Sequence, residues 1–207
     1  MIDLYTAPTP NGRKISILLE ELNVKYNSIW IDIKKNEKIL KEFDAISPSN
    51  KIPAIVDREN GKSIFESGAI LLYLSNKYGK FIPKKYYWET MEWFFFQISQ
   101  VGPFLGQAHQ YLFYNSGKSA FAEEKCRGYV KRVYETLDKR LAENNYLAVE
   151  YSIADIATWP WIVSFEKHQI NLEKYSNVLR WYKLISKRPA VIKGFNTVGN
   201  FINIPLS

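Results

Sequence analysis

The hydrophobic pattern of the chain changes once, shortly before residue 80, and this change limits the folds open to the sequence. Before that point, short β-type runs alternate with runs of apolar residues at helical spacing. The β-type runs are 2–5, 26–31, 53–57 and 63–65, and the helical runs are 15–22, 37–43 and 67–77. After Gly79 no strand-like alternation returns, and the expected helices are 88–101, 120–143, 152–165, 175–187 and 190–198. The sequence therefore predicts a small α/β domain followed by an all-helical one.

The order of elements in the first part, β-α-β-α-β-β-α, predicts a small sheet with helices packed on it, as in the thioredoxin fold. A turn at 59–62 joins the last two strands into a hairpin. The segment 79–85 has the composition of a linker. We therefore predict one domain at 1–80 and a second at 87–207.

The composition restricts the chemistry available to the protein. The 207 residues include one cysteine, Cys126, and two histidines, His109 and His168. A single cysteine excludes an intramolecular disulfide framework, a four-cysteine zinc site and a Cys-x-x-Cys redox pair, and we expect Cys126 to be a small packing residue. Two histidines leave little for a metal centre or a catalytic triad. We expect no metal, and we expect chemistry to come from hydroxyls, amides, carboxylates, backbone N–H groups or a bound cofactor.

The charge and hydropathy of the chain bear on its partners and its location. The sequence has 28 basic and 21 acidic residues, a net charge of +7, but the lysines and arginines are scattered. We therefore expect a solvated surface that mildly favours anionic ligands, with no nucleic acid as partner. The sequence has no apolar stretch of about 18 residues, and its first residues lack the basic and apolar regions of a signal peptide. We expect a cytoplasmic protein that does not bind membranes.

The segment 9–12, Thr-Pro-Asn-Gly, lies between the first predicted strand and the first predicted helix. A helix N-terminus presents unpaired N–H groups and partial positive charge, so a thiolate or another anion is stabilised there. Asn11 can cap this helix, and Thr9 can reach the same space. Both residues are candidates for binding an anion, and ordinary capping is the alternative.

Pro53 stands at the start of the third predicted strand. Proline has no N–H, so it suits the first position of a strand. A cis Ile52–Pro53 bond would turn the Ile52 backbone outward, where its N–H and C=O could pair with the backbone of a ligand. Because cis is the minority state of X–Pro bonds, the segment by itself predicts a trans bond.

Glu66 and Ser67 join the last predicted strand to the helix that follows it. Ser67 is a good helix cap, with the Glu66 carboxylate beside it. Free N–H groups and the Ser67 hydroxyl can bind a carboxylate, while Glu66 can accept from an ammonium group. The pair suits an α-amino acid, and a capped helix whose acid complements the helix dipole is the alternative.

Three segments together resemble the glutathione transferase superfamily: the strand followed by 9–12, the segment 50–55, and Phe-Glu-Ser-Gly-Ala-Ile-Leu-Leu-Tyr-Leu at 65–74. The resemblance extends over nearly the whole chain. In the helical part, Ser-Ile-Ala-Asp at 152–155 resembles the N-capping box of that superfamily, which is a structural element. More narrowly, the segments 7–12, 102–107 and 159–161 resemble the bacterial nu-class branch, whose members are glutathione-dependent disulfide-bond oxidoreductases.

The resemblance implies a thioredoxin-like glutathione-binding domain and an all-α glutathione transferase C-terminal domain. Matched motif by motif, Glu66 and Ser67 would hold the γ-glutamyl amino and carboxylate groups. Ile52 would pair through its backbone with the cysteinyl part, and the Pro53 bond would be cis. Lys51 is either a cation for the glycyl carboxylate or a solvated surface lysine.

The resemblance also implies an activity. Thr9 and Asn11 would face the sulfur of glutathione, which is bound as substrate in reduced or oxidised form. The site would hold two glutathione thiols or their disulfide and reduce a small disulfide, and the protein would form a homodimer. One alternative is a transferase that conjugates glutathione to apolar electrophiles, and another is a non-catalytic module that uses this fold to bind partners.

Four further side chains have possible roles under this resemblance. Tyr5 could be the sulfur ligand, although its place in the strand favours packing. His109 could line the substrate mouth or be a surface histidine with satisfied hydrogen bonds. Lys125 or Arg132 could approach the bound thiols, because in relatives the helix that carries them borders the cleft.

Overall fold

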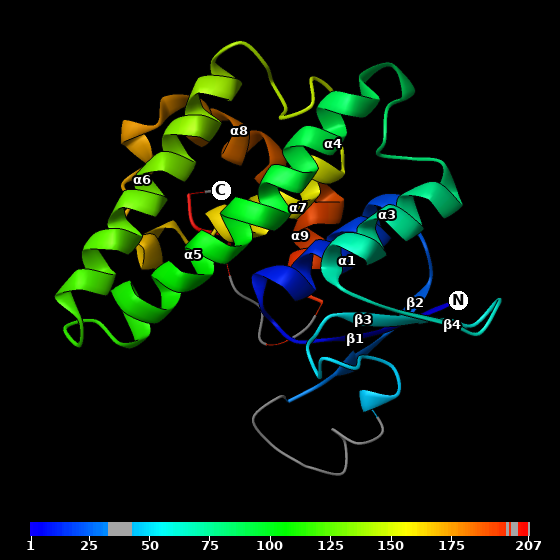
Figure 1. Cartoon of the computed structure of the whole chain (residues 1–207). Helices are drawn as coiled ribbons and strands as arrows, with labels where there is room; N and C mark the ends of the chain where they lie inside the picture. Colours follow the sequence, from blue (N-terminus) through cyan, green and yellow to red (C-terminus); the bar gives the residue numbers. More distant parts are fainter. Residues whose placement is uncertain (33–42, 198, 200–202, 207) are drawn as a thin grey trace. The chain divides into compact units, whose positions relative to one another are not determined.

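The structure, a computed structural model, describes residues 1–32, 43–197, 199 and 203–206 (Figure 1). The chain divides into two compact units. The first comprises Met1–Lys80 and Lys187–Ile204, and the second comprises Phe81–Ser186 and the chain end from Pro205. The helix expected at 37–43 lies outside the described residues except for Phe43.

The first unit contains a four-stranded sheet in the order β2-β1-β3-β4. Its strands are β1 (Ile2–Thr6), β2 (Tyr26–Trp30), β3 (Ala54–Asp57) and β4 (Lys62–Phe65). Strand β1 pairs parallel to β2 and antiparallel to β3, and β3 and β4 form the expected hairpin. The sheet confirms the α/β part of the predicted fold.

Two helices of the first unit follow strands and bury apolar stripes. They are α1 (Pro10–Leu22) and α3 (Ser67–Tyr78), which Figure 1 shows beside the sheet. The predicted apolar stripes of the two helices are buried: Ile15, Leu18, Leu19 and Leu22 on α1, and Ile70, Leu71 and Leu74 on α3; Ile17 of α1 is buried as well. Each helix therefore begins at the end of a strand, which brings both N-termini to the same part of the unit.

The last helix, α9 (Pro189–Phe195), packs on α1 of the first unit. Gly194 makes this packing close, because a Cβ atom built there would lie 2.5 Å from the Ile17 Cα. Ser16 Oγ donates to the Gly194 carbonyl at 2.6 Å, and Arg188 makes a bidentate ion pair with Glu21. Helix α9 thus belongs to the same compact unit as Met1–Lys80. The domain ranges 1–80 and 87–207 along the sequence stay a prediction.

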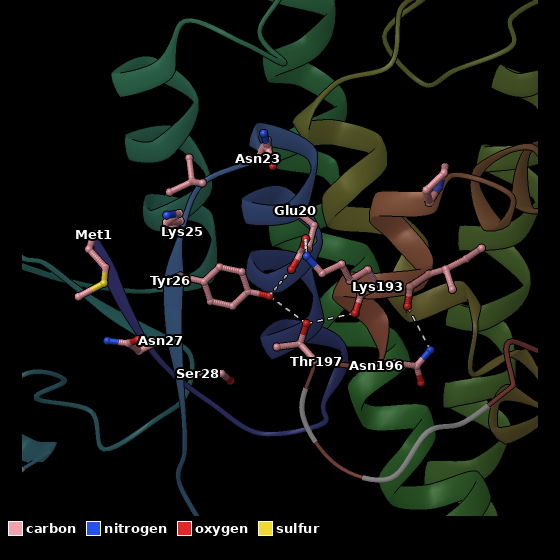
Figure 2. A pocket seen from close by; sticks show the side chains of 13 residues that line it. Met1, Glu20, Asn23, Lys25, Tyr26, Asn27, Ser28, Lys193, Asn196 and Thr197 are labelled. Carbon is pink, nitrogen blue, oxygen red and sulfur yellow. Dashed lines mark hydrogen bonds and ion pairs between the residues drawn. The ribbon is translucent and has the colours of Figure 1, made fainter.

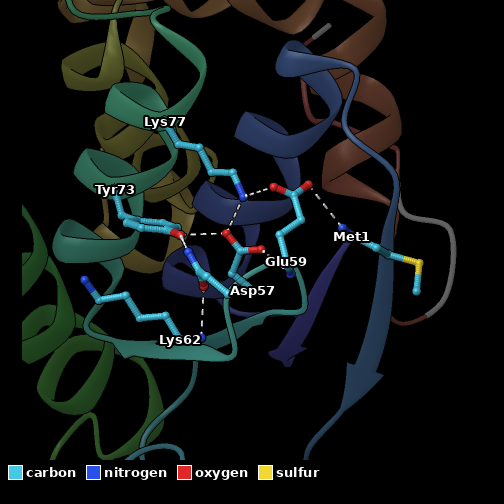
Figure 3. A network of polar contacts seen from close by, with 7 residues as sticks. Met1, Asp57, Glu59, Lys62, Tyr73 and Lys77 are labelled. Atoms are coloured by element: carbon cyan, nitrogen blue, oxygen red, sulfur yellow. Dashed lines mark hydrogen bonds and ion pairs between the residues drawn. The ribbon is translucent and has the colours of Figure 1, made fainter.

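A buried carboxylate at the end of β3 joins the sheet to α3 (Figure 3). The Asp57 side chain is 0% exposed and accepts hydrogen bonds from Lys77, from Tyr73 Oη at 2.6 Å and from the Glu59 N–H at 3.1 Å. Lys77 also pairs with Glu59, and Glu59 pairs with the N-terminal amine of Met1. Burial by itself would raise the pKa of Asp57, but the hydrogen bonds from Lys77 and Tyr73 outweigh it and lower the pKa to about 2.

We expect Asp57→Asn to lower the free energy of unfolding by about 2 kcal/mol at pH 7. The carboxylate stabilises the fold above pH 4, and this contribution is lost as the pH falls towards 2, because folding lowers its pKa. Urea unfolding at pH 7 and pH 3 measures both effects. Asp44→Asn is the matched control, because the exposed Asp44 accepts from the exposed Asn50 amide, and its effect should stay below about 0.5 kcal/mol. Equal losses for the two variants would contradict the role of Asp57.

The second unit is helical in its described residues, as expected. Its α-helices are α4 (Tyr87–Phe96), α5 (Gly102–Ala108), α6 (Ala120–Ala142), α7 (Ile153–Ile162) and α8 (Ser176–Ser186). Short 3₁₀ turns lie at Lys84–Tyr86, Phe165–His168 and Leu172–Lys174. Within the described residues, no helix is both long and apolar enough to cross a membrane.

The helix expected at 88–101 continues further than the sequence predicts. A π-helical turn at Gln97–Val101 leads directly into α5, and a second π-helical turn follows at His109–Tyr114. Pro103 cannot donate a backbone hydrogen bond, and in a regular α-helix its ring would disturb the preceding turn. The wider π turn, in which the Gly102 N–H donates to the Gln97 carbonyl, accommodates this break.

The predicted capping box at the start of α7 is present. Ser152 Oγ accepts from the Ala154 N–H at 3.2 Å, and Asp155 Oδ2 accepts from the Ser152 N–H at 3.1 Å. Asp155 also accepts from the Leu147 N–H at 2.9 Å and from Trp181 Nε1 at 2.8 Å. The box therefore holds together three separate segments of the second unit.

Candidate functional site

A cavity of about 170 Å³ in the first unit gathers most of the residues that the sequence singles out. Its lining residues are Asn11, Ser49, Lys51, Ile52, Pro53, Glu66 and Ser67. They come from the start of α1, from the segment before β3 and from the start of α3. Among the predicted site residues, Thr9 is absent from this lining, and Ser49 is an addition that no sequence signal indicated.

The start of α1 differs from the expected arrangement in its cap. Thr9, and not Asn11, is the N-cap: its Oγ1 accepts from the Gly12 N–H at 3.1 Å. Pro10 fits the first helical position, because its missing N–H has no partner to lose there, and this leaves Thr9 at the cap. Asn11 is thereby free of the capping role and lies in the first turn, at the cavity.

The segment before β3 approaches the cavity through its backbone. The Ile52–Pro53 bond is cis, as the resemblance implies, and the trans prediction from the segment alone is wrong. The buried Ser47 hydroxyl donates to the Lys51 carbonyl at 2.9 Å and thus holds the loop that precedes Ile52. The Lys51 side chain is exposed, which leaves both of its predicted roles open.

The start of α3 has an unusual backbone. Glu66 occupies the N-cap position with φ 69° and ψ 119°, and its side chain makes no capping hydrogen bond. A positive φ is unfavourable for a residue with a Cβ atom, and such strain concentrates at functional sites. Ser67 is the first helical residue and not the cap that the sequence predicts. The capping part of the alternative is therefore not observed, while the exposed Glu66 carboxylate stays available to a ligand or to the helix dipole.

Lys14 is the site feature that sequence reasoning missed. Its side chain is 2% exposed, and its Nζ donates to Ser67 Oγ at 3.3 Å. Burial lowers the pKa of Lys14 to about 7, against the opposing effect of the Glu66 charge. A signal was present, because Lys14 shares one helix face with Leu18 and Leu22 at intervals of four residues.

Other candidates from the sequence lie elsewhere. Tyr5 packs against Phe43 with ring centroids 5.8 Å apart, which agrees with its expected packing role. Cys126 is 2% exposed on α6, and burial raises the pKa of its thiol. Lys125 and Arg132 are exposed on the same helix.

His109 belongs to the second unit and pairs with the buried His168. Their Nε2 atoms are 3.0 Å apart, and His168 Nδ1 lies 2.9 Å from Tyr134 Oη. Burial and the nearby Lys167 lower the pKa of His109 to about 4, so both rings are neutral at pH 7. His109 therefore has a protein hydrogen-bond partner, as expected of a histidine with satisfied hydrogen bonds.

A second cavity of about 1020 Å³ lies between β2, α1 and α9 of the first unit (Figure 2). Tyr26 Oη is 2.9 Å from both Glu20 Oε1 and Thr197 Oγ1, and Lys193 pairs with Glu20. None of the predicted site residues lines this cavity. No group of three His, Cys, Asp or Glu side chains that could hold a metal ion occurs in the described part of the chain.

Comparisons with known proteins bear on this arrangement. Residues 1–76 match the model of the glutathione S-transferase N-terminal domain, and residues 120–184 match that of the C-terminal domain. The chain is 44% identical to the disulfide-bond oxidoreductase YfcG of Escherichia coli over 92% of each chain. It is 36% identical to YghU of the same organism, over 100% of this chain and 77% of that one.

Among solved structures, a glutathione transferase from Pseudomonas putida, with one glutathione disulfide bound per subunit, aligns with a TM-score of 0.89 and 33% identity. The alignment covers 96% of this chain and 92% of that one. A homologue from Lodderomyces elongisporus, with two glutathione molecules per subunit, aligns with a TM-score of 0.87 and 34% identity over 95% and 98% of the chains. From its domain matches and these relatives, the chain belongs to the glutathione S-transferase family.

Proposed function

We propose that the protein is a glutathione-dependent disulfide-bond oxidoreductase that reduces small disulfides with two glutathione thiols. The observation that carries the proposal is a cavity suited to glutathione in a protein whose single cysteine is buried. The reactive sulfur must then come from the bound substrate. Two relatives are named disulfide-bond oxidoreductases, and the aligned structures hold glutathione disulfide or two glutathione molecules, which supports this function.

The lining residues match the functional groups of glutathione. Glu66 would accept from the γ-glutamyl ammonium, and the Ser67 hydroxyl would donate to the neighbouring carboxylate. Ile52 would pair through its backbone with the cysteinyl part, and Lys51 would face the glycyl carboxylate. A volume of about 170 Å³ is below the 300–1,000 Å³ or so of complete ligand sites, so the cavity would enclose only part of the tripeptide.

The reaction consists of two thiol–disulfide exchanges. In the first, the thiolate of one glutathione attacks a sulfur of the substrate disulfide, whose S–S bond breaks to give a mixed disulfide and a free thiolate, which takes up a proton. In the second, another glutathione thiolate attacks the glutathione sulfur of the mixed disulfide. Glutathione disulfide forms, and the second substrate thiol is released. Two glutathione thiols thus supply the two electrons.

The start of α1 can stabilise the thiolate form of bound glutathione. A thiol of pKa about 8.5 needs a shift of roughly 1.5 units, or about 2 kcal/mol, to be half ionised at pH 7. A helix N-terminus contributes roughly 0.3–1 kcal/mol and a hydrogen bond to a charged group roughly 1.5–3 kcal/mol. One donor such as the Asn11 amide, together with the helix dipole, is therefore sufficient without a general base.

We expect Thr9→Ala and Asn11→Ala each to lower disulfide-reductase turnover roughly tenfold, because Asn11→Ala loses one hydrogen bond to a charged group and Thr9→Ala loses the helix cap. Asn11 would act through its amide, and Thr9 through the cap that orients the first turn of α1. Thr9→Ser is the matched control, because it keeps the capping oxygen. Steady-state kinetics and thermal unfolding of each variant separate turnover from stability. Unchanged turnover in both alanine variants would remove these residues from the mechanism.

Parallel assays with a small disulfide and a chlorodinitroaromatic electrophile test the function itself. We expect disulfide reduction to be the faster reaction. Conjugation far faster than reduction would instead support a transferase for apolar electrophiles. Failure to bind glutathione or its disulfide in calorimetry would support a non-catalytic module. A homodimeric state and a cytoplasmic location stay predictions, which sedimentation and cell fractionation would check.

A further inference from the structure

The sheet of the first unit ends in a strand, β2, whose outer edge pairs with no other segment of the described structure. Among the described strands, β2 pairs with β1 alone. Its backbone bonds to β1 reach from Lys25 to Ile31. Because the side to which a strand residue directs its N–H and C=O alternates along the strand, Tyr26, Ser28 and Trp30 direct theirs away from β1.

The second cavity, of about 1020 Å³, lies along this edge (Figure 2). Tyr26 points from β2 towards α1 and α9, where its hydroxyl meets Glu20 and Thr197. Asn27 points to the opposite face, where its amide donates to Asp3 at 2.9 Å. A lysine beside a solvated edge is a common protection against pairing, but such protection needs no cavity large enough for a complete ligand. The space therefore favours an occupant.

The backbone groups and the cavity together favour an extended peptide as this occupant. A strand added to β2 would pair with the outward N–H and C=O groups of Tyr26 and Ser28, which a compact small molecule would leave unpaired. Alternate side chains of the added strand would point to the two faces of the sheet. On the face of Tyr26 they would lie beside Pro189 and Ile192, and the Ile192 side chain is 40% exposed. Apolar residues suit these positions.

The charges of the lining favour acidic residues at the other positions of the peptide. Three cationic groups line the cavity, the Met1 amine, Lys25 and Lys193, and the one carboxylate among the described lining residues is that of Glu20. The amine and Lys193 have carboxylate partners, whereas Lys25 is exposed and forms no ion pair with the described residues. Lys25 precedes Asn27 by two positions and shares its face, so an acidic side chain there would meet an uncompensated cation.

A second copy of this chain suits the edge less well. Two β2 strands paired about a twofold axis would bring two cavities together, and neither would be filled. The Tyr26 side chains could not fill them, because each is held by Glu20 and Thr197 of its own chain. Two cationic linings would also face each other.

We propose that the outer edge of β2 is a docking site for an extended segment of another protein in which apolar and acidic residues alternate. The segment would add a strand to the sheet, with its apolar side chains towards α9 and its acidic side chains towards Lys25. The edge shares no lining residue with the cavity proposed for glutathione, so this inference goes beyond the proposed function and does not depend on it.

NMR titration of the full-length protein with the capped peptide Val-Glu-Val-Glu-Val-Glu tests the proposal. We expect shifts at Tyr26–Trp30 and α9, and at least about tenfold weaker binding of the matching Val-Lys peptide. Ser28→Pro removes an N–H that β1 does not use, and proline is tolerated on an edge strand. This variant should lose at least about tenfold in affinity and keep disulfide-reductase turnover. Ser28→Ala, which keeps the N–H, should bind like wild type.

A charge variant tests the acidic preference and decides should Ser28→Pro fail to fold. Lys25→Glu should weaken binding of the Val-Glu peptide roughly five- to tenfold, because it turns an attraction into a repulsion. Lys174→Glu is the matched control, an exposed lysine of the second unit with the same change in charge. Equal affinities of these two variants would contradict the charge match.

Three results would overturn the docking site. The first is no binding at about 1 mM peptide, or equal binding by the proline and alanine variants of Ser28. The second is slow amide exchange at Tyr26 and Ser28 in the free protein, as slow as at Asn27 and Ile29, because another part of the chain would then cover the edge. The third is a self-association that Ser28→Pro abolishes in sedimentation, which would make a second copy the occupant.

Discussion

We expect Asp155→Ala to destabilise the protein by roughly 3–5 kcal/mol, the range for breaking a buried charged network. The side chain of Asp155 is 0% exposed and accepts from the Leu147 N–H, the Ser152 N–H and Trp181 Nε1. Alanine would leave these three buried donors without that acceptor, and each loss costs about 1–3 kcal/mol. Since domains are stable by only about 5–15 kcal/mol, this loss would remove a large share of the stability of the protein.

The expected loss of stability comes from the hydrogen bonds that Asp155 accepts and not from its negative charge as such. Burial raises the pKa of Asp155 to about 6, although the three N–H donors act in the opposite direction. Glu135→Ala is the matched control, because Glu135 is 57% exposed and pairs with the exposed Lys131 one helical turn away. Its effect should stay below about 0.5 kcal/mol. Urea unfolding followed by tryptophan fluorescence measures both variants, and similar midpoints for them would refute the structural role of the box.

Much of the fold follows from local patterns in the sequence. Apart from the run 37–43, which lies outside the described residues except for Phe43, the period-two and helical runs before Gly79 correspond to strands and helices, because their apolar residues face one small core. The capping box at Ser152 and Asp155 is equally predictable from the sequence, since its two hydrogen bonds lie within four consecutive residues. Features that depend on short-range hydrogen bonds or periodicity are thus predictable from one sequence.

Features that depend on distant partners were harder to predict. Nothing in the local pattern near Gly194 indicates that the last helix packs on α1, although the glycine itself permits the close approach. The continuation of the helix through Gly102 and Pro103 depends on a π turn that compensates for the missing donor. In both cases, packing outweighed the residue preferences by which a single segment is assigned.

The candidate site was likewise predictable only in its local features. Its three segments were identified from the sequence, since each begins a helix or a strand. Their detailed roles were not, because Thr9 took the cap expected of Asn11, and Glu66 took the cap expected of Ser67. Ser67, which Lys14 contacts, lies 53 positions further along the chain, so the burial of Lys14 could be suspected but this contact could not.

Gly12→Ala is expected to lower disulfide-reductase turnover roughly a hundredfold while changing glutathione affinity much less. Gly12 is buried in the first turn of α1, and an added Cβ would overlap the Ala7 carbonyl oxygen and Thr6 Oγ1. That carbonyl already accepts from the Thr9 N–H at 2.7 Å, so it cannot move without the turn. Small displacements of reacting groups can reduce rates by about two orders of magnitude.

Turnover should fall more than affinity, because the clash at Gly12 affects only the start of α1. Glu66, Ser67 and the Ile52 backbone belong to other segments and should still bind the tripeptide. Gly128→Ala on α6 is the matched control: its Cβ meets no atom within 4 Å, and it should keep wild-type turnover and gain about 0.5–1 kcal/mol of stability. Kinetics and calorimetric affinity are compared at a temperature where all variants are folded. Wild-type turnover in Gly12→Ala would mean that the start of α1 does not hold the reacting sulfur.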